Sequence, residues 1–217
     1  MTDFAVARRN MVEGQVRTAD VTDLRILTAM REIPRENFVP AAAAELAYLD
    51  LNLAVDKAGV RRMLKPMVFA KLVQAADIKP TDRVLDVGCA AGYSAAVLAR
   101  LAGQVVALEE DAGLAEAARS ALAAQPNVTV VGGPLAAGWP PNAPYDVILL
   151  EGATQIAPDA FLGQLKDGGR LTCVLGTSPD AKAMLYCRSG DELGGRPIFD
   201  AGAAVLPGFV KNPEFAF

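Results

Sequence analysis

The segment from Val84 to Tyr93 constrains the fold of this 217-residue chain more than any other stretch. The apolar run 84–87 is typical of a buried strand, and the run 88–92, Gly-Cys-Ala-Ala-Gly, is a glycine-rich turn. A helical pattern follows, and then a second apolar run that ends in Glu109. A strand, a glycine turn, a helix and a strand with a terminal acid form a βαβ unit of the nucleotide-binding type.

The spacing of the glycines separates two classes of ligand. A dinucleotide site prefers G-x-G-x-x-G, because the second glycine admits a pyrophosphate. Here the pattern is Gly88-x-Ala90-x-Gly92, with alanine in the middle. S-adenosylmethionine has no pyrophosphate, and Asp86 would face its ammonium and sulfonium groups. The pattern therefore favours S-adenosylmethionine, and a nicotinamide-dependent oxidoreductase stays an alternative against which the glycine spacing counts.

Apolar runs alternate with helical patterns from residue 83 to residue 176. The predicted strands are 84–87, 105–108, 128–131, 147–150 and 171–175, and the predicted helices are 93–101, 112–124 and 158–165. The link 132–145 is proline-rich and is predicted as a loop. Apolar strands separated by helices indicate a parallel sheet covered on both faces. Beyond it, 184–187 and 201–206 flank the turn-rich segment 189–195, which predicts an antiparallel hairpin at the edge of the sheet.

The first 80 residues are predicted to be helical and irregular. Leucine, isoleucine and methionine recur at helical spacing over 23–32, and two more helices are predicted over 41–46 and 66–76. The chain is therefore expected to divide into three parts: an N-terminal helical module on the substrate side (1–80), a cofactor-binding α/β core (81–176), and a C-terminal hairpin and tail that complete the sheet (177–217).

Composition excludes several classes of function. The chain has no histidine, so histidine metal ligands and the commonest general base are absent, and no metal site is predicted. A net charge of −4 without a basic stripe argues against a nucleic-acid partner. The sequence has no apolar run of bilayer length and no signal-peptide pattern, which argues against a membrane association. Its three cysteines form no C-x-x-C pair, which favours a cytoplasmic protein with reduced thiols. No particular oligomeric state is favoured.

Several motifs, in register over about residues 8–176, resemble the protein-L-isoaspartate O-methyltransferases. The N-terminal motifs are Arg9-Asn10-Met11-Val12-Glu13, Ala29-Met30-Arg31-Glu32-Ile33-Pro34-Arg35, Phe38-Val39-Pro40 and Ala47-Tyr48-x-Asp50. The later ones are the glycine loop with its helix (86–99), Gly138-Trp139-Pro140, Ala143-Pro144-Tyr145-Asp146 and Gln164-Leu165-Lys166-x-Gly168-Gly169-Arg170-Leu171. The order of so many motifs makes the resemblance more specific than a shared fold.

This resemblance implies a Rossmann-like, S-adenosylmethionine-dependent methyltransferase fold with a mainly parallel seven-stranded sheet. Members of the family methylate the stray α-carboxylate of isoaspartyl residues in damaged proteins. The ester then collapses to a succinimide, which partly reopens as normal aspartate. Such chemistry suits a chain without histidine, because a carboxylate with an unperturbed pKa of about 4 is already ionised at neutral pH.

The resemblance also implies roles for individual residues. The methionine end of the cofactor is assigned to the loop that contains Asp86, Gly88, Cys89, Ala90 and Gly92, the ribose to Glu109, and the adenine to Gly133, Pro134 and Leu135. Tyr48 and Asp50 match the substrate-side segment, and Asp146 matches an aspartate of the fourth strand. Structural readings stay open: Glu109 as an acid that starts a helix, Asp146 as a cap, and Tyr48 and Asp50 as packing residues.

Three departures from the family pattern fall at functional positions, and one of them is Ala90 in the glycine loop, which is expected to be tolerated. Aligned on Pro66, the chain has Leu64 in place of the family's serine, and Arg61 and Arg62 in place of glutamine and threonine. No catalytic residue is therefore assigned. Arg61, Arg62 and Lys65 are the candidates for holding the acceptor carboxylate, with a solvated loop as the alternative for this cluster. Pro134 stands where the family has an aspartate that accepts a hydrogen bond from adenine. A non-catalytic relative that binds cofactor or peptide is the alternative hypothesis.

Overall fold

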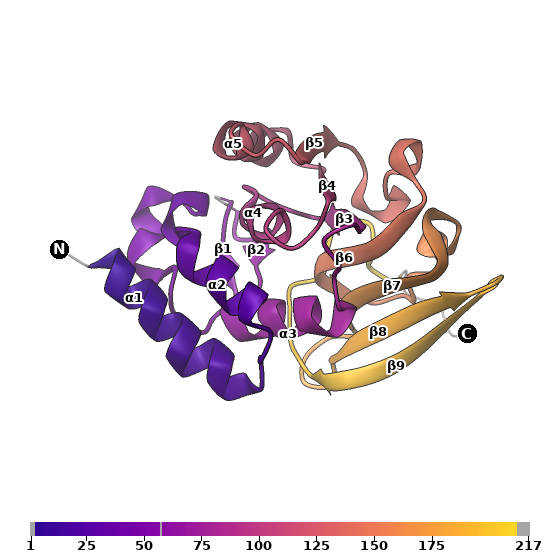
Figure 1. The fold of residues 1–217 in the computed structure, drawn as a ribbon, viewed down its shortest axis with the longest axis horizontal. Coiled ribbons are helices and arrows are strands. Elements are labelled where there is room, and N and C mark those ends of the chain that lie inside the picture. The colour runs from indigo at the N-terminus through magenta and orange to yellow at the C-terminus, as the bar shows by residue number, and fades with distance from the viewer. Residues whose placement is uncertain (1–2, 57, 212–217) are drawn as a thin grey trace, which may run out of the picture.

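The computed structural model describes residues 3–56 and 58–211, and its centre is a seven-stranded sheet (Figure 1). The strands are β3 (Arg83–Val87), β4 (Gln104–Glu109), β5 (Val128–Gly132), β6 (Tyr145–Thr154), β7 (Leu165–Leu175), β8 (Lys182–Ser189) and β9 (Glu192–Asp200). Their order is β5-β4-β3-β6-β7-β8-β9. The strands from β3 to β7 are parallel, and β8 and β9 add an antiparallel hairpin at one edge. The predicted Rossmann-like fold is confirmed.

Helices surround this sheet and make up most of the N-terminal part. The α-helices are α1 (Phe4–Met11), α2 (Leu24–Glu32), α3 (Pro66–Ala76), α4 (Tyr93–Leu98) and α5 (Ala112–Leu122), and a π-helix, Val12–Val16, continues α1. Short 3-10 helices occupy 17–19, 35–38, 41–46, 135–137, 140–142 and 159–164. The segments predicted as helices at 41–46 and 158–165 thus form 3-10 rather than α-helices, and the predicted loop 132–145 holds only two short 3-10 turns.

Local sequence explains where these helices begin. The Asp23 carboxylate accepts a hydrogen bond from the Arg25 N–H at 2.8 Å, and Asp111 accepts one from the Leu114 N–H at 2.9 Å, so each caps the helix that follows it. Helix α3 starts at Pro66, where the missing N–H costs nothing because the first turn has no acceptor for it. A small antiparallel pair, β1 (Leu53–Ala54) and β2 (Arg62–Met63), precedes α3.

The predicted second strand of the C-terminal hairpin is wrong. Strand β9 runs over Glu192–Asp200 and begins inside the segment predicted as a turn, whereas 201–206 contains no strand of the sheet. The turn needs only two residues, Gly190 and Asp191, because Ser189 already pairs with Glu192. The remaining glycines of this segment therefore enter the strand. Residues 212–217 of the predicted tail lie outside the described residues.

The segment after β9 returns to the carboxyl end of β6. Val205 forms an isolated parallel bridge with Ala153, and the Leu206 N–H donates to the Ala153 carbonyl at 2.9 Å. A Cβ built on Gly88 would lie 3.1 Å from Leu206 Cδ2, so Leu206 packs directly against the glycine loop. Further on, the Phe209 ring stacks on Phe161 at a centroid distance of 6.1 Å.

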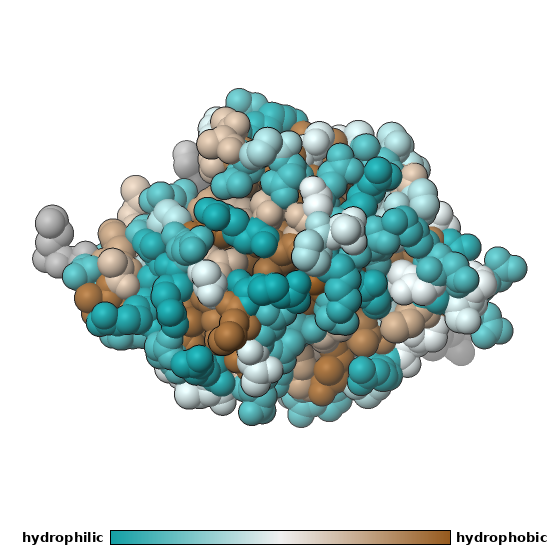
Figure 2. Space-filling model, in the orientation of Figure 1, coloured by the Kyte–Doolittle hydropathy of each residue, from teal (hydrophilic) through white to brown (hydrophobic). Residues whose placement is uncertain are grey.

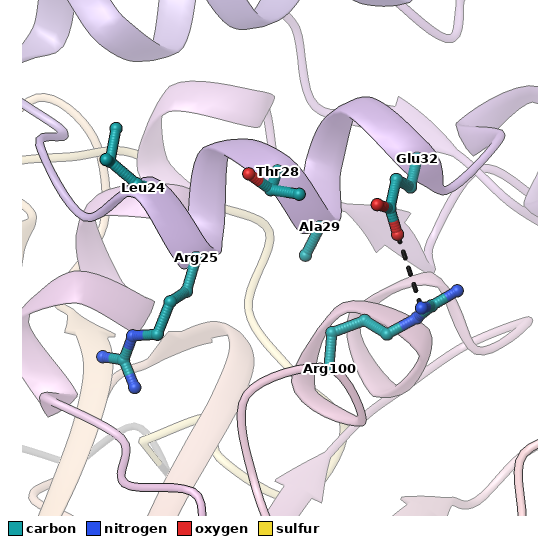
Figure 3. A pocket seen from close by; sticks show the side chains of 6 residues that line it. All are labelled: Leu24, Arg25, Thr28, Ala29, Glu32 and Arg100. Atoms are coloured by element: carbon teal, nitrogen blue, oxygen red, sulfur yellow. Dashed lines mark ion pairs between the residues drawn. The ribbon is translucent and has the colours of Figure 1, made fainter.

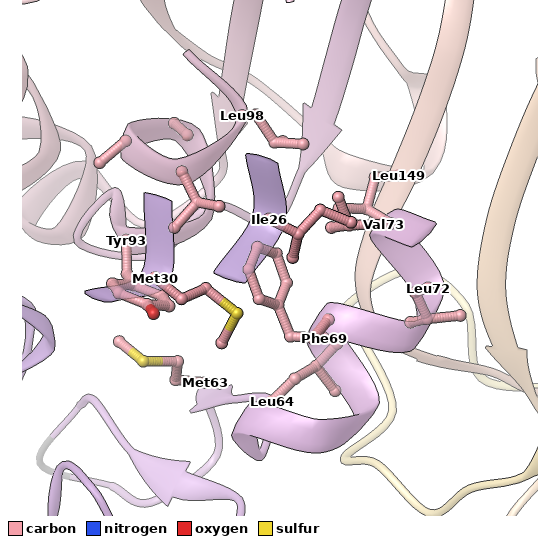
Figure 4. Close-up of a cluster of buried hydrophobic side chains, with 14 of the residues drawn as sticks. Ile26, Met30, Met63, Leu64, Phe69, Leu72, Val73, Tyr93, Leu98 and Leu149 are labelled. Carbon is pink, nitrogen blue, oxygen red and sulfur yellow. The ribbon is translucent and has the colours of Figure 1, made fainter. Parts of the chain in front are cut away.

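One apolar core joins the N-terminal helices to the sheet. Ile26 and Met30 of α2 and Phe69 of α3 meet Tyr93 of α4 and Leu149 of β6 in a single buried cluster (Figure 4). A second cluster, which contains Leu85, Ile148 and Phe161, fills the opposite face of the sheet. Both faces are thus covered, as the apolar strands predict.

On the face that Figure 2 shows, brown patches are divided by hydrophilic side chains, which is the ordinary surface of a globular protein. None of the helices within residues 3–56 and 58–211 is both long and apolar enough to cross a bilayer.

Candidate cofactor and acceptor site

Three acidic residues lie at the carboxyl ends of neighbouring strands. Asp86 of β3 pairs with Ala107 of β4 and with Leu149 of β6. Glu109 and Glu151 follow those partners by two residues, and because side chains alternate along a strand they emerge on the same face as Asp86. The exposed fractions of Asp86, Glu109 and Glu151 are 0%, 0% and 5%. The strand order reverses between β3 and β6, which is where open parallel sheets bind ligands.

The glycine loop brings its backbone close to these acids. Gly88 and Gly92 have φ angles of +81° and +99°, a region that favours glycine, and a Cβ at Gly92 would lie 2.8 Å from Leu122 Cδ1. The N–H groups of Gly88 and Cys89 donate to the Leu108 carbonyl at 2.8 and 3.2 Å, which ties the loop to β4. The loop therefore presents backbone rather than side chains to a ligand.

The two non-glycine residues inside the loop behave differently from each other. Ala90 adopts a φ of +50°, a left-handed conformation that costs an alanine about 1 kcal/mol. Cys89 is buried, and burial raises the pKa of its thiol well above the ordinary value. The thiol consequently stays protonated and has no nucleophilic character at neutral pH.

The Glu109 carboxylate accepts four hydrogen bonds. Oε1 accepts from the N–H groups of Glu110 and Asp111 at 2.9 and 3.1 Å. Oε2 accepts from the Ala90 N–H at 2.8 Å and from Arg61 Nη2 at 2.7 Å. Asp111 rather than Glu109 caps α5, and Glu109 joins the glycine loop to the β4 end. These bonds hold the acid where the second strand of a nucleotide-binding unit meets a ribose.

Arg61 occupies the space between the loop and this acid. Its Nη2 also donates to the Gly88 carbonyl at 3.1 Å, its side chain is 8% exposed, and its Nε is buried without a partner. Outside the ion pair lies a hollow of about 380 Å³, within the range of small-molecule sites. Its lining is Val60, Arg61, Glu109, Glu110, Asp111, Ala112 and Pro207.

Asp86 and Glu151 each have a buried carboxylate oxygen without a hydrogen-bond partner. Ser94 Oγ donates to Asp86 Oδ2 at 2.6 Å, while Asp86 Oδ1 and Glu151 Oε1 are buried and unpaired. Burial raises the pKa of Asp86 to about 7; the Ser94 hydrogen bond opposes this rise and the charge of Glu109 adds to it. Burial also raises the pKa of Glu151 well above its ordinary value, and the charge of Asp86 raises it further. Such a pair is suited to a cationic ligand.

Two of the buried polar residues near the site, Glu151 and Arg35, were not predicted as site residues. Glu151 follows the apolar run 147–150 as Glu109 follows the run 105–108, and that pattern was its available signal. Arg35 lies within a family motif, but nothing in the sequence indicates its contacts. Its Nε donates to the Ala47 carbonyl at 2.8 Å, its Nη2 to the Leu64 carbonyl at 2.6 Å, and its guanidinium lies 4.7 Å from the centroid of the Tyr93 ring. Arg35 thus links the N-terminal segments to α4 below the glycine loop.

The segment predicted to meet the adenine adjoins the other side of Glu109. The Gly133 N–H donates to the Glu109 carbonyl at 3.2 Å, and the Leu135 N–H lies 3.3 Å from Glu110 Oε2. Leu135 is fully buried, and a Cβ at Gly88 would lie 3.5 Å from its Cδ1. Pro134 has no N–H and starts the short 3-10 turn 135–137.

The cationic segment before α3 divides between the core and a second hollow. Arg62 and Lys65 line a polar hollow of about 560 Å³ together with Asp50, and Lys65 Nζ lies 3.8 Å from Asp50 Oδ2. The Leu64 side chain instead enters the apolar core, where it is 2% exposed (Figure 4). The structure thus places Arg61 at the acid, Arg62 and Lys65 at the polar hollow, and Leu64 at neither.

Two other predicted residues lie away from both hollows. The Tyr48 hydroxyl accepts from Arg8 Nε at 2.9 Å and donates to Glu36, which connects it to the N-terminal helices. Asp146 lies at the opposite end of β6, where it accepts from the Arg83 N–H at 2.8 Å and from Lys166. These contacts connect Tyr48 to the N-terminal helices and Asp146 to β3 and β7, and the roles predicted for both residues stay predictions.

A further hollow lies along α2 (Figure 3). It measures about 400 Å³ and is lined by Leu24, Arg25, Thr28, Ala29, Glu32 and Arg100. Glu32 and Arg100 form an ion pair across it at 3.4 Å. None of the loop residues and none of the three buried acids lines this hollow, so it is not part of the candidate site.

Comparison with known proteins agrees with this geometry. Residues 7–195 match the family model described as protein-L-isoaspartate(D-aspartate) O-methyltransferase. The chain is 45% identical over 190 residues to the protein-L-isoaspartate O-methyltransferase of Methylorubrum extorquens, covering 87% of this chain and 82% of the relative. It is 38% identical to the protein-L-isoaspartate O-methyltransferase of Koribacter versatilis, and the match covers 87% of this chain and 84% of that relative.

Solved structures give the same result. A protein-L-isoaspartate O-methyltransferase superposes with a TM-score of 0.78 at 26% identity, covering 92% of this chain and 66% of that one. A homologue from Plasmodium falciparum, solved in complex with S-adenosyl-L-homocysteine, is 15% identical and shares the fold. Its TM-score is 0.75, and the superposition covers 94% of this chain and 99% of that one. The family model and the identity to these relatives agree with the glycine loop and its acids. The chain therefore belongs to the protein-L-isoaspartate(D-aspartate) O-methyltransferase family.

Proposed function

We propose that the protein transfers a methyl group from S-adenosylmethionine to the α-carboxylate of isoaspartyl residues in proteins. The observation that carries this proposal is the group of three buried acids, Asp86, Glu109 and Glu151, around a glycine loop in a chain of this family. The relatives described above are all named as methyltransferases, which gives no support to a non-catalytic role.

The acids fit the charges of S-adenosylmethionine. The unpaired oxygens of Asp86 and Glu151 suit its ammonium and sulfonium groups, and Glu109 at the end of β4 suits the two hydroxyls of its ribose. The open backbone at Gly88 and Gly92 admits a ligand close to the strand ends. When bound, S-adenosylmethionine supplies a methyl group activated by the attached sulfonium.

The reaction requires little proton transfer by the protein. An acceptor carboxylate oxygen bonds to the methyl carbon while the carbon–sulfur bond breaks and its electron pair goes to sulfur, which gives a methyl ester and S-adenosylhomocysteine. The carboxylate is ionised at neutral pH, so no general base is required. The contribution of this chain is to align the reactants, and Arg62 and Lys65 provide positive charge in the polar hollow for an anionic acceptor.

We also propose an acceptor and a cellular compartment for the protein. The acceptor is a protein or peptide with an isoaspartyl residue, and the polar hollow beside Asp50 is the place where it enters. The free cysteines Cys89, Cys173 and Cys187 are consistent with a reducing compartment, and the cytoplasm is the location we propose.

Transfer of a labelled methyl group tests this function. The protein is incubated with labelled S-adenosylmethionine and either an isoaspartyl peptide or its normal aspartyl twin. Label in the isoaspartyl peptide alone is the expected result. Equal label in both peptides would contradict the acceptor specificity, and label in neither would contradict the activity.

A further inference from the structure

We propose that Arg61 guards the cofactor site in the free protein and becomes the residue that positions the acceptor carboxylate once the cofactor has displaced it. This inference rests on the proposed function. Its starting point is the buried contact of 2.7 Å between Arg61 Nη2 and Glu109 Oε2, at the place where a ribose would bind.

Only Arg61 can give up its bond to Glu109. Three of the four donors to this carboxylate are backbone N–H groups, those of Ala90, Glu110 and Asp111, and the loop and the start of α5 hold them in place. The fourth donor is the end of a long side chain. A carboxylate accepts about four hydrogen bonds and Glu109 already accepts four, so a ribose hydroxyl can bind it only where Arg61 has left.

The backbone beside Arg61 allows its side chain to leave. The Val55 N–H donates to the Arg61 carbonyl at 3.0 Å, so the main chain stays anchored while the side chain rotates. The neighbouring residue, Val60, is 59% exposed, which places the segment at the surface of the molecule. On the other side, Arg62 lines the polar hollow proposed for the acceptor.

Once displaced, the guanidinium needs a new anionic partner. A guanidinium that stays beside the glycine loop after its displacement would be partly buried and unpaired, which is unfavourable, and Arg61 Nε already lacks a partner. The acceptor carboxylate is the anion that the reaction brings to this edge, and a guanidinium can bind it through two parallel hydrogen bonds. Cofactor binding would then prepare the acceptor site, and the cofactor would bind before the peptide.

Replacement of Arg61 by alanine tests both halves of this proposal, because the two effects have opposite signs. In calorimetric titrations Arg61→Ala should bind S-adenosylmethionine about tenfold or more tightly, since no charge-assisted bond has to be broken. In methyl-transfer assays the same variant should raise the KM for the isoaspartyl peptide about tenfold or more at a similar kcat. Arg61→Lys, which keeps the charge, should recover part of both values.

Matched variants make the result specific to Arg61. Arg62→Ala removes the adjacent arginine without touching Glu109, so cofactor affinity should stay unchanged. Arg100→Ala, in the hollow of Figure 3, should leave both affinity and KM unchanged. If Arg61→Ala binds the cofactor as tightly as the wild type or more weakly, Arg61 does not guard the cofactor site. If the KM for the isoaspartyl peptide is unchanged, Arg61 does not position the acceptor.

The test also separates this inference from the proposed function. If the wild type methylates no isoaspartyl peptide, the proposed function fails, yet the cofactor titrations still decide whether Arg61 guards the site. In that case the acceptor role is decided by titrating the isoaspartyl peptide into protein saturated with S-adenosylhomocysteine. Loss of peptide binding in Arg61→Ala would support that role, and equal binding would overturn it.

Discussion

At the scale of single residues, Ala90 holds a conformation that its own side chain opposes. Its φ of +50° is accessible to glycine without strain. We expect Ala90→Gly to raise the free energy of unfolding by about 1 kcal/mol, as measured by urea denaturation. Ala91→Gly is the control, because Ala91 has no positive φ and gains nothing from glycine. A destabilised Ala90→Gly variant would show that the methyl group contributes more through packing than it costs in strain.

Asp86 should make stability and cofactor affinity depend on pH in opposite directions. Its pKa of about 7 lies above its ordinary value of 3.8, so the folded protein favours the protonated acid. The stabilisation is complete below about pH 4 and is lost as the pH rises towards 7. A cationic cofactor prefers the ionised acid, so its affinity should rise with pH and level off above about 7.

Urea denaturation and calorimetric titration between pH 5 and 8 check this expectation. In Asp86→Asn, the free energy of unfolding should fall less between pH 5 and 7 than in the wild type. The affinity of this variant for the cofactor should rise less over the same range. Asp146→Asn serves as the control: the backbone and Lys166 hydrogen bonds hold the pKa of Asp146 below its ordinary value despite some burial, so its effect lies at lower pH. A pH profile of Asp86→Asn that matched the wild type would remove Asp86 as the source.

Leu64 shows how an aligned position can differ in environment. Its side chain is buried among Phe69, Met63 and Tyr93 (Figure 4), so Leu64→Ser would place a hydroxyl in the apolar core and leave a cavity. We expect a loss of about 2–4 kcal/mol in the free energy of unfolding, measured by urea denaturation, and no gain in methyl transfer. Increased transfer by a stable variant would show that residue 64 reaches the acceptor.

The local sequence predicted some site residues and missed others for a physical reason. The conformations at Gly88 and Gly92 and the strand-end position of Glu109 follow from neighbours in the sequence, and they were predictable. The contact of Arg61 with Glu109 joins residues far apart in the chain. Such a contact depends on how the segment before α3 packs on the sheet, which no local pattern encodes.

At the scale of elements, the β8–β9 hairpin depends on a glycine under an aromatic ring. Tyr186 pairs with Gly195, and a Cβ at residue 195 would lie 2.3 Å from Tyr186 Cε1. Gly195→Ala should therefore lower the free energy of unfolding by about 1–3 kcal/mol, measured by thermal or urea denaturation. Gly194→Ala is a matched control, because no atom lies within 4 Å of its new methyl group. Equal stability of the two variants would contradict this account.

The same hairpin explains where element prediction failed. The inner parallel strands were predictable because their apolar runs are buried on both faces, as at Val84–Val87, whereas β5 is only half-buried. Strand β9 is exposed over much of its length and carries two glycines and Pro197, so its sequence resembles a loop. Its pairing with β8 defines it as a strand, and pairing is a property of the assembled sheet.

At the scale of the whole molecule, the buried cluster of Figure 4 crosses the predicted boundary at residue 80. Helices α2 and α3 share this core with α4 and β6, so the N-terminal part has no separate core of its own. We expect a single unfolding transition in scanning calorimetry, with equal calorimetric and van't Hoff enthalpies. Two resolved transitions would instead favour the division into an N-terminal module and an α/β core.

The return of the chain at Leu206 has a consequence for protein synthesis. Gly88 is made early in translation, but Leu206, whose side chain packs against it, follows much later in the chain. A nascent chain can form β3 and β4 early, whereas the support of the loop waits for residues 204–209. The loop therefore lacks this contact until residues 204–209 have been made, and a protein shortened before Leu206 would carry Asp86, Glu109 and Glu151 beside a loop without it.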